Sequence, residues 1–334
     1  MALLPGAVIS GKWSAKRVVI QKSIGSGANG DVYLVRFEGR LVAMKASKTA
    51  ADIAMEWAVL SQVSQKGNVL PSPLLMDDAF VSGTPLFFYL MEWVEGDPFD
   101  VVFPKLTGLE RIQVVEQIFA GLDDLHRIGY AFCDIKPQNI LIQRARGPMV
   151  RFVDVGGVTT FGRSVRQFTP LYDRGFWGLG GRQSEPAYDV VGVMLLFVCV
   201  LNGQSTGSIS KLPVSARQKW LRRAVENLAD LGLRPVLLEV LDNRIVKADE
   251  AKRACQNVLS QIGRRKKAPS SAKPAPAGAS AGLPKSGKAV VSKSPAAATG
   301  ARGKHKMDWT ERLMWVSLSM AFSAACLAWV TILR

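Results

Sequence analysis

The chain has 334 residues, 48% of them hydrophobic, and 43 lysines and arginines against 27 acidic residues give it a net charge of +16. About 260 residues of this composition can bury a sizeable core, so a folded region with appended segments is expected. Four scattered cysteines without paired or metal-ligand spacing exclude a disulfide-stapled scaffold and favour a reducing compartment. The sequence shows no internal repeat.

A glycine-rich segment lies at residues 24–33, where Gly25, Gly27 and Gly30 have the spacing G-x-G-x-x-G. Glycines at these positions let backbone N–H groups approach phosphates without an intervening Cβ. Dinucleotide-binding folds use the same spacing but open a helix after it, whereas residues 32–35 continue as an alternating strand. The segment therefore predicts a phosphate-binding strand-turn-strand.

The next predicted strand ends in Lys45, and a predicted helix at 51–62 carries Glu56 eleven residues later. A lysine that faces a buried nucleotide needs a carboxylate to fix its position. Glu56 and Asp52 are the two acids of this helix that could be its partner. A solvated surface position is disfavoured for both charges, because Lys45 ends an apolar strand and Glu56 lies among apolar residues.

Downstream, residues 86–96 form an apolar strand that runs into an acidic connector ending in glycine. Residues 134–139 read Asp-Ile-Lys-Pro-Gln-Asn, and residues 154–156 read Asp-Val-Gly. Phosphoryl transfer needs a carboxylate to orient the attacking hydroxyl, a cation for the moving phosphate and oxygen ligands for magnesium. These two strings supply all three.

In this order and spacing the motifs resemble those of the protein kinase family, and more narrowly the eukaryotic-like (Hanks-type) serine/threonine protein kinases. The resemblance covers roughly residues 20–190. It implies an α+β, bilobal fold within a kinase domain at 14–263. The β-rich N-lobe is expected at 14–93 and the α-helical C-lobe at 97–263.

The resemblance also implies roles for single residues. Asp134 would orient the substrate hydroxyl and take its proton, and Lys136 would neutralise charge on the γ-phosphate. Asn139 and Asp154 would ligate Mg²⁺, or Mn²⁺ in its place. The expected ATP-binding residues are Gly25, Gly27, Gly30, Val32, Lys45, Glu56, Glu92 and Val94, with Met91 behind the adenine and Trp93 in the hinge.

The chain departs from the family pattern around the catalytic motifs. Phe132 and Cys133 replace the usual His-Arg before Asp134, which predicts activity that does not depend in the usual way on phosphorylation of the activation segment. A neighbouring carboxylate raises the pKa of a thiol, so we expect Cys133 to be inert rather than redox-active. Val155 replaces the usual Phe of the metal-binding turn.

The segment from 154 to about 186 corresponds to the activation segment, and its end matches the family only loosely. Glu185 and Pro186 stand in reversed order relative to the usual Ala-Pro-Glu. By resemblance, Asp189 is expected to support the catalytic loop from below, and Arg244 is expected to pair with Glu185. His126 precedes Asp134 by the interval usual in the family, so it is expected to pack or to form a hydrogen bond rather than to act in catalysis.

Residues 264–308 differ in composition from everything before them. Between 264 and 306 there are eleven Lys or Arg and no Asp or Glu, among many Ala, Pro, Ser and Gly. Such a composition predicts a disordered linker, because it has too little apolar surface to offset the entropy of ordering. Its charge suits nucleic acid or anionic lipid headgroups. The segment that follows favours the headgroups, and nucleic acid is disfavoured as a partner.

Residues 313–333 carry no charge over twenty-one positions, enough for a helix to span roughly 31 Å. Trp309, Trp315 and Trp329 lie near its ends, where aromatic rings prefer the interface. The segment predicts a single-pass C-terminal membrane anchor rather than a buried helix, with the kinase domain in the cytoplasm by the positive-inside rule. Residues 190–201 are also apolar but too few to span, and they predict a buried helix.

These expectations combine into a membrane-anchored, ATP-dependent serine/threonine kinase that phosphorylates protein substrates near the cytoplasmic membrane face. Two alternatives stay open: a small-molecule phosphotransferase on the same fold, and a pseudokinase scaffold. The pair Lys136 and Pro137 disfavours the first. The presence of every phosphate- and metal-handling residue disfavours the second.

Overall fold

The computed structural model describes residues 3–27, 30–64, 69–145, 147–166, 168–229 and 232–267. All of them belong to one unit of the chain, Met1–Ser270, and a second unit, Ser271–Arg334, lies outside the described residues. The predicted linker beyond Lys267 and the predicted membrane span at 313–333 therefore lie outside them as well. No helix in the described ranges is long and apolar enough to cross a membrane.

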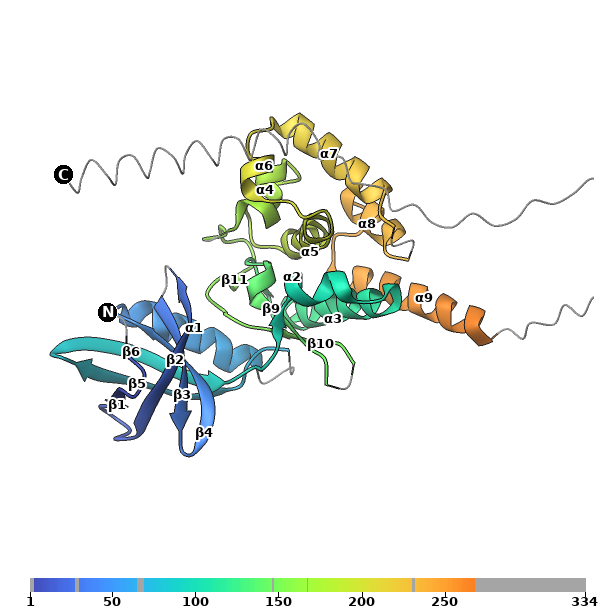
Figure 1. Cartoon of the computed structure of the whole chain (residues 1–334). Helices are drawn as coiled ribbons and strands as arrows, with labels where there is room; N and C mark the ends of the chain where they lie inside the picture. Colours follow the sequence, from blue (N-terminus) through green and yellow to red (C-terminus); the bar gives the residue numbers. More distant parts are fainter. Residues whose placement is uncertain are drawn as a thin grey trace, which may run out of the picture. The chain divides into compact units, whose positions relative to one another are not determined.

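The N-terminal lobe is a six-stranded antiparallel sheet with the order β1-β2-β3-β4-β6-β5 (Figure 1). Its strands are β1 (Val8–Ser10), β2 (Arg17–Gly27), β3 (Gly30–Phe37), β4 (Arg40–Ser47), β5 (Pro73–Val81) and β6 (Thr84–Glu92). Strand β4 is buried on both faces, which explains its long apolar run. Val42, Met44 and Ala46 join the core inside the curled sheet. Ala43 and Lys45 alternate with them and face the other side.

Helix α1 (Ala50–Val63) packs against that other side of the sheet, over β4, β5 and β6 (Figure 1). Its buried residues Ile53, Glu56, Leu60 and Val63 recur at intervals of three and four. The helical period therefore carries Glu56 into the interior together with the apolar side chains.

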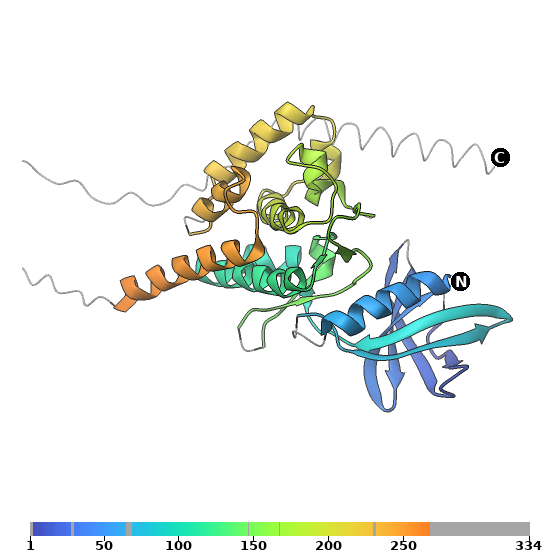
Figure 2. The same ribbon diagram turned by 180° about the vertical axis from the view of Figure 1, so that it is seen from behind.

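The C-terminal lobe is mainly helical. Its elements are β7 (Asp97–Pro98), α2 (Phe99–Val102), η2 (Phe103–Lys105), α3 (Gly108–Arg127), β8 (Tyr130–Ala131), η3 (Pro137–Asn139), β9 (Ile140–Gln143), β10 (Met149–Phe152), β11 (Thr159–Thr160), η4 (Pro170–Tyr172), α4 (Arg174–Trp177), α5 (Pro186–Leu201), α6 (Thr206–Ile209), α7 (Val214–Glu226), α8 (Arg234–Leu241) and α9 (Ala248–Lys267). Helix α3 begins with a capping box in which Thr107 and Glu110 bond each other's backbone N–H. Helix α9 runs beside α3 in both views (Figures 1 and 2).

Helix α5 lies in the core of this lobe and is apolar around most of its circumference, as a buried helix must be. The prediction of a buried helix at 190–201 is confirmed. The α+β, bilobal prediction is also confirmed, with a β-rich N-lobe and a helical C-lobe. Strand β1 lies ahead of the predicted domain start at 14, and α9 continues past the predicted end at 263.

Candidate active site

A buried lysine joins the two lobes. Lys45 of β4 places its Nζ 2.9 Å from Oε1 and 2.8 Å from Oε2 of Glu56 on α1. The same Nζ lies 2.7 Å from Oδ1 of Asp154, which follows β10 in the C-lobe. Lys45 and Glu56 are only 3% and 2% exposed, so the pair is shielded from solvent. The structure brings Lys45 to Glu56 and not to the alternative acid, Asp52.

The charges of this cluster support one another. Burial disfavours the ammonium of Lys45, but Asp154 and Glu56 outweigh burial and hold the pKa of Lys45 above its ordinary value. Burial also opposes ionisation of Asp154, yet Lys45 and the backbone N–H of Gly156 keep its pKa below the ordinary value. Burial raises the pKa of Glu56, and Lys45 offsets part of that rise. At neutral pH the cluster therefore keeps a cation between the lobes.

The predicted catalytic residues of the 134–139 segment come together around one carboxylate. Asn139 donates from Nδ2 to the backbone oxygen of Asp134 at 3.0 Å and to its Oδ2 at 2.8 Å. Lys136 places its Nζ 2.6 Å from the same Oδ2. Pro137 opens the η3 turn that brings Asn139 back toward Asp134. Asp134 is buried and held by a cation and an amide, a geometry suited to orienting a hydroxyl.

The two predicted metal ligands lie on adjoining segments, because the backbone N–H of Val153 donates to the oxygen of Asn139 at 2.9 Å. Oδ1 of Asn139 and Oδ2 of Asp154 accept no hydrogen bond from the described residues. Free amide and carboxylate oxygens are the ligands that Mg²⁺ prefers. A metal held here would also need oxygens from outside the chain. In the described part of the chain, no group of three His, Cys, Asp or Glu side chains could hold a metal ion.

Gly157, which the sequence did not single out, lies against Asp134. A Cβ on Gly157 would lie 2.5 Å from the Cβ of Asp134 and 3.0 Å from the backbone oxygen of Phe132. Only a glycine lets the turn after Asp154 approach Asp134 so closely. The signal for it in the sequence is the Gly-Gly pair, since Gly157 directly follows Gly156.

The catalytic loop is supported from α5. Asp189, which is 0% exposed, accepts hydrogen bonds from the backbone N–H of Phe132 at 2.7 Å and of Cys133 at 2.8 Å. His126 lies 3.0 Å from the same carboxylate through Nε2. This is the position expected for Asp189, and His126 has the hydrogen-bonding role expected of it. Burial, followed by the charge of Asp189, raises the pKa of the Cys133 thiol strongly, in line with an inert cysteine.

The expected pairing of Arg244 with Glu185 is wrong. Glu185 instead forms an ion pair with Arg174, the first residue of α4. Arg244 lies three residues after α8 ends, and its guanidinium is 3.2 Å from Oδ2 of Asp242. Arg174 lies within the activation segment itself, so Glu185 finds its partner in the same segment and not in the distant Arg244.

The predicted hinge is fixed to the C-lobe by a two-point ion pair. Arg151 of β10 donates to Oε1 of Glu92 at 2.9 Å and to Oε2 at 2.7 Å. Glu92 ends β6, and Val94, two residues on, is buried. The ion pair therefore holds the backbone of the hinge in place. A backbone that is already ordered loses less entropy when it binds a ligand.

The glycine-rich segment lies next to Lys45. In the sheet register, Val32 is paired with Gly25 on one side and with Lys45 on the other. Gly27 pairs with Gly30 where β2 and β3 meet. A Cβ on Gly30 would lie 2.4 Å from the backbone oxygen of Ala46, and its φ is +129°, so glycine is required there.

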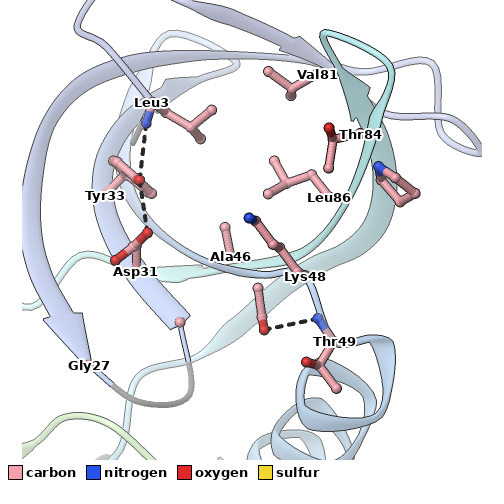
Figure 3. Close-up of a pocket in the computed structure, with 13 residues that line it drawn as sticks. Leu3, Gly27, Asp31, Tyr33, Ala46, Lys48, Thr49, Val81, Thr84 and Leu86 are labelled. Atoms are coloured by element: carbon pink, nitrogen blue, oxygen red, sulfur yellow. Dashed lines mark hydrogen bonds between the residues drawn. The ribbon is translucent and has the colours of Figure 1, made fainter. Parts of the chain in front are cut away.

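A separate cavity of about 270 Å³ opens at the mouth of the curled sheet (Figure 3). Tyr33 lies on its wall between the backbone N–H of Leu3 and the carboxylate of Asp31, and Lys48 extends across it. Ala46 faces this cavity, whereas Lys45 faces away. Gly27 and Gly30 of the glycine-rich segment also line this cavity. The cavity nevertheless lies on the opposite side of β4 from the predicted catalytic groups and is not the candidate site.

Comparisons with known proteins agree with this geometry. Residues 18–227 match the family model described as the protein kinase domain. The serine/threonine-protein kinase YabT of Bacillus subtilis is 34% identical over 284 residues, which cover 83% of this chain and 81% of that protein. A probable casein kinase II subunit alpha homolog of Encephalitozoon cuniculi is 26% identical over 190 residues, 56% of this chain and 58% of that protein.

Among solved structures, vaccinia related kinase 3 superposes with a TM-score of 0.55 at 14% identity, covering 79% of this chain and 93% of that one. At this identity the likeness concerns the fold alone. The family match covers more than half of the chain, and the sequence relative covers more than two thirds of it. The chain belongs to the protein kinase family and is a protein serine/threonine kinase.

Proposed function

We propose that this kinase transfers the γ-phosphoryl group of ATP to a protein hydroxyl with the residues assembled around Lys45 and Asp134. The observation that carries the proposal is the position of Lys45, within 2.9 Å of carboxylates from both lobes. Protein kinases generally use ATP and Mg²⁺. When bound, ATP supplies the phosphoryl group and Mg²⁺ neutralises charge on the phosphates.

Each residue has a task that its surroundings support. Asp134, fixed by Asn139 and Lys136, orients the substrate hydroxyl and accepts its proton. Lys136, beside Asp134, lies against the γ-phosphate and neutralises negative charge that develops there. Asn139 and Asp154 offer their free oxygens to the metal.

The remaining residues bind the nucleotide. Lys45 binds the α- and β-phosphates while Glu56 holds it in place. Gly25, Gly27, Gly30 and Val32 cover the phosphates, and the backbone of Glu92 and Val94 meets the adenine edge. Catalysis of this kind is mostly positioning and electrostatics, so the ion pairs that fix these groups matter as much as the groups themselves.

The test is phosphoryl transfer by the full chain with labelled ATP, Mg²⁺ and a generic basic protein, beside Asp134→Ala and Lys45→Ala. We expect labelled protein with the wild type and a loss of at least about 100-fold in both variants. ATP turnover without labelled protein would instead indicate a small-molecule acceptor. Nucleotide binding without any turnover would indicate a pseudokinase scaffold.

The second part of the proposal is a membrane anchor at residues 313–333, with the kinase domain on the cytoplasmic face near its protein substrates. Its support is the uncharged run of twenty-one residues after a basic tract. We expect the full chain to stay in the membrane fraction after alkaline extraction and a chain ending at 312 to be released. Release of the full chain by the same treatment contradicts the anchor.

The basic tract at 264–306 is proposed to bind anionic lipid headgroups, at about 1 kcal/mol per well-placed charge. The chain ending at 312 should bind vesicles containing phosphatidylserine and not neutral vesicles. Replacing the eleven basic residues of the tract with Gln should abolish this binding. Binding to duplex DNA but not to anionic vesicles at the same salt concentration would assign the tract to nucleic acid instead.

A further inference from the structure

A buried tyrosine touches the Lys45–Glu56 pair from a third element. Tyr89 lies on β6 and is 0% exposed. Its hydroxyl donates to Oε2 of Glu56 at 3.0 Å. Tyr89 is the register partner of Lys45 across the antiparallel pair β4 and β6, so both side chains project from the same face of the sheet toward α1.

The side chain of Tyr89 has little freedom to move. Trp57 of α1 packs beside its ring, with the centroids 6.1 Å apart. Burial, followed by the charge of Glu56, holds the pKa of Tyr89 well above its ordinary value, so its hydroxyl stays protonated and donates. A buried hydroxyl and a buried carboxylate are both costly unless they are hydrogen-bonded, and here each satisfies the other.

The charged and titratable groups around Glu56 are few. Lys45 reaches it from β4, Tyr89 reaches it from β6, and Asp154 acts on it only through its charge. Lys45 therefore has two anchors, Glu56 and Asp154, and Glu56 itself is fixed by Tyr89. In the proposed reaction Asp154 would also hold the metal, and this would weaken its hold on Lys45. Glu56 then becomes the main anchor of the lysine.

We propose that Tyr89 is a positioning residue: its hydroxyl fixes the carboxylate of Glu56 and, through it, the ammonium of Lys45 that binds the nucleotide phosphates. The inference rests on the proposed roles of Lys45 and Glu56. A tyrosine that served only as packing would need no hydroxyl, because a phenylalanine ring would fill the same buried position. The hydroxyl should therefore matter for phosphate binding and not for adenine binding.

The experiment compares Tyr89→Phe with the wild-type full chain by measuring the dissociation constants of ATP with Mg²⁺ and of adenosine. Phenylalanine keeps the ring and its packing against Trp57. We expect ATP affinity to fall about tenfold, the range of a hydrogen bond to a charged group, while adenosine affinity is unchanged. The KM for ATP should rise while the KM for the protein substrate does not. Tyr130→Phe is the matched control, since it also removes a tyrosine hydroxyl bond to α1, the bond to Oε1 of Gln62 at 3.0 Å, but does not touch Glu56, and it should change neither constant.

A double-mutant cycle with Glu56→Gln shows whether Tyr89 acts through Glu56. We expect Tyr89→Phe to add little to the loss that Glu56→Gln already causes. Additive losses would overturn the inference, and so would equal losses of ATP and adenosine affinity in Tyr89→Phe. If Glu56→Gln leaves ATP affinity intact, the proposed role of Glu56 fails and the inference fails with it. If Glu56→Gln weakens ATP binding and Tyr89→Phe does not, only the inference about Tyr89 is overturned.

Discussion

At the scale of single residues, Gly157 shows how a side chain of one hydrogen can be a functional requirement. The turn after Asp154 packs directly against Asp134, and a methyl group at 157 would overlap the Cβ of that aspartate. In Gly157→Ala the turn or Asp134 must shift, and a displacement of about 1 Å at a catalytic group costs about 100-fold in rate. We expect kcat to fall by about that factor, measured by steady-state protein phosphorylation.

The control for this variant is Gly108→Ala, because nothing lies within 4 Å of a Cβ at Gly108 and alanine favours the start of α3. It should keep wild-type activity. A Gly157→Ala protein with unchanged kcat would mean that the close approach to Asp134 has no catalytic importance. A parallel thermal melt separates a local shift from general unfolding.

At the scale of elements, the activation segment is tied down by its own ion pairs. Asp173, 1% exposed, accepts hydrogen bonds from Nε of Arg182 at 2.8 Å, from the hydroxyl of Tyr188 at 2.9 Å and from the backbone N–H of Phe176 at 2.9 Å. Arg174 pairs with Glu185 beside it. These pairs support the prediction that a chain with Cys133 in place of the usual arginine needs no phosphate to order the segment.

Asp173→Asn tests whether these bonds order the activation segment. Loss of the charge weakens the bonds to Arg182 and Tyr188, and we expect the free energy of unfolding to fall by about 2 kcal/mol with a loss of activity. Treating the wild-type kinase with a phosphatase should leave its activity unchanged, which is measured with the same labelling assay. Inactivation by the phosphatase would contradict ordering by the ion pairs alone.

The sequence predicted the features whose residues lie close together along the chain. Glu56, which lies among apolar residues in the sequence, is on the buried face of α1, and the segment 134–139 brings Asp134, Lys136 and Asn139 together within one turn. Asp189, more than fifty residues from Phe132, was placed by resemblance alone. Such partners depend on how helices pack, and packing leaves no trace in the spacing of a single sequence.

The misses have the same cause. The partner of Glu185 depends on the path of the activation segment, so Arg174 took the place expected for Arg244. Tyr89 lies in an apolar run where any large side chain fits the pattern, and only the register with Lys45 brings its hydroxyl to Glu56. Gly157 was one of two adjacent glycines, and no spacing distinguishes which of them touches Asp134.

At the scale of the whole molecule, buried cysteines couple stability to alkaline pH. Burial raises the pKa of Cys199 in α5 from 9.0 to about 12. Burial, followed by the charge of Glu116, does the same for Cys255 in α9. Between pH 9 and 12 the thiols of the unfolded chain lose their protons while these two keep theirs in the folded state. The folded state then binds more protons than the unfolded state, so stability is full below pH 9 and falls as the pH rises.

Each of these cysteines should contribute a decline of about 1.4 kcal/mol per pH unit to the free energy of unfolding above pH 9. The measurement is urea unfolding of the full chain at pH 8, 9 and 10, for the wild type and for Cys255→Ala. Alanine leaves a cavity and lowers stability at every pH, but the slope above pH 9 should become shallower by the contribution of one thiol. Gly108→Ala should keep the wild-type slope. If Cys255→Ala has the same slope as the wild type, Cys255 titrates in the folded protein as it does in the unfolded chain, and α9 opens to solvent more readily than its packing against α3 implies.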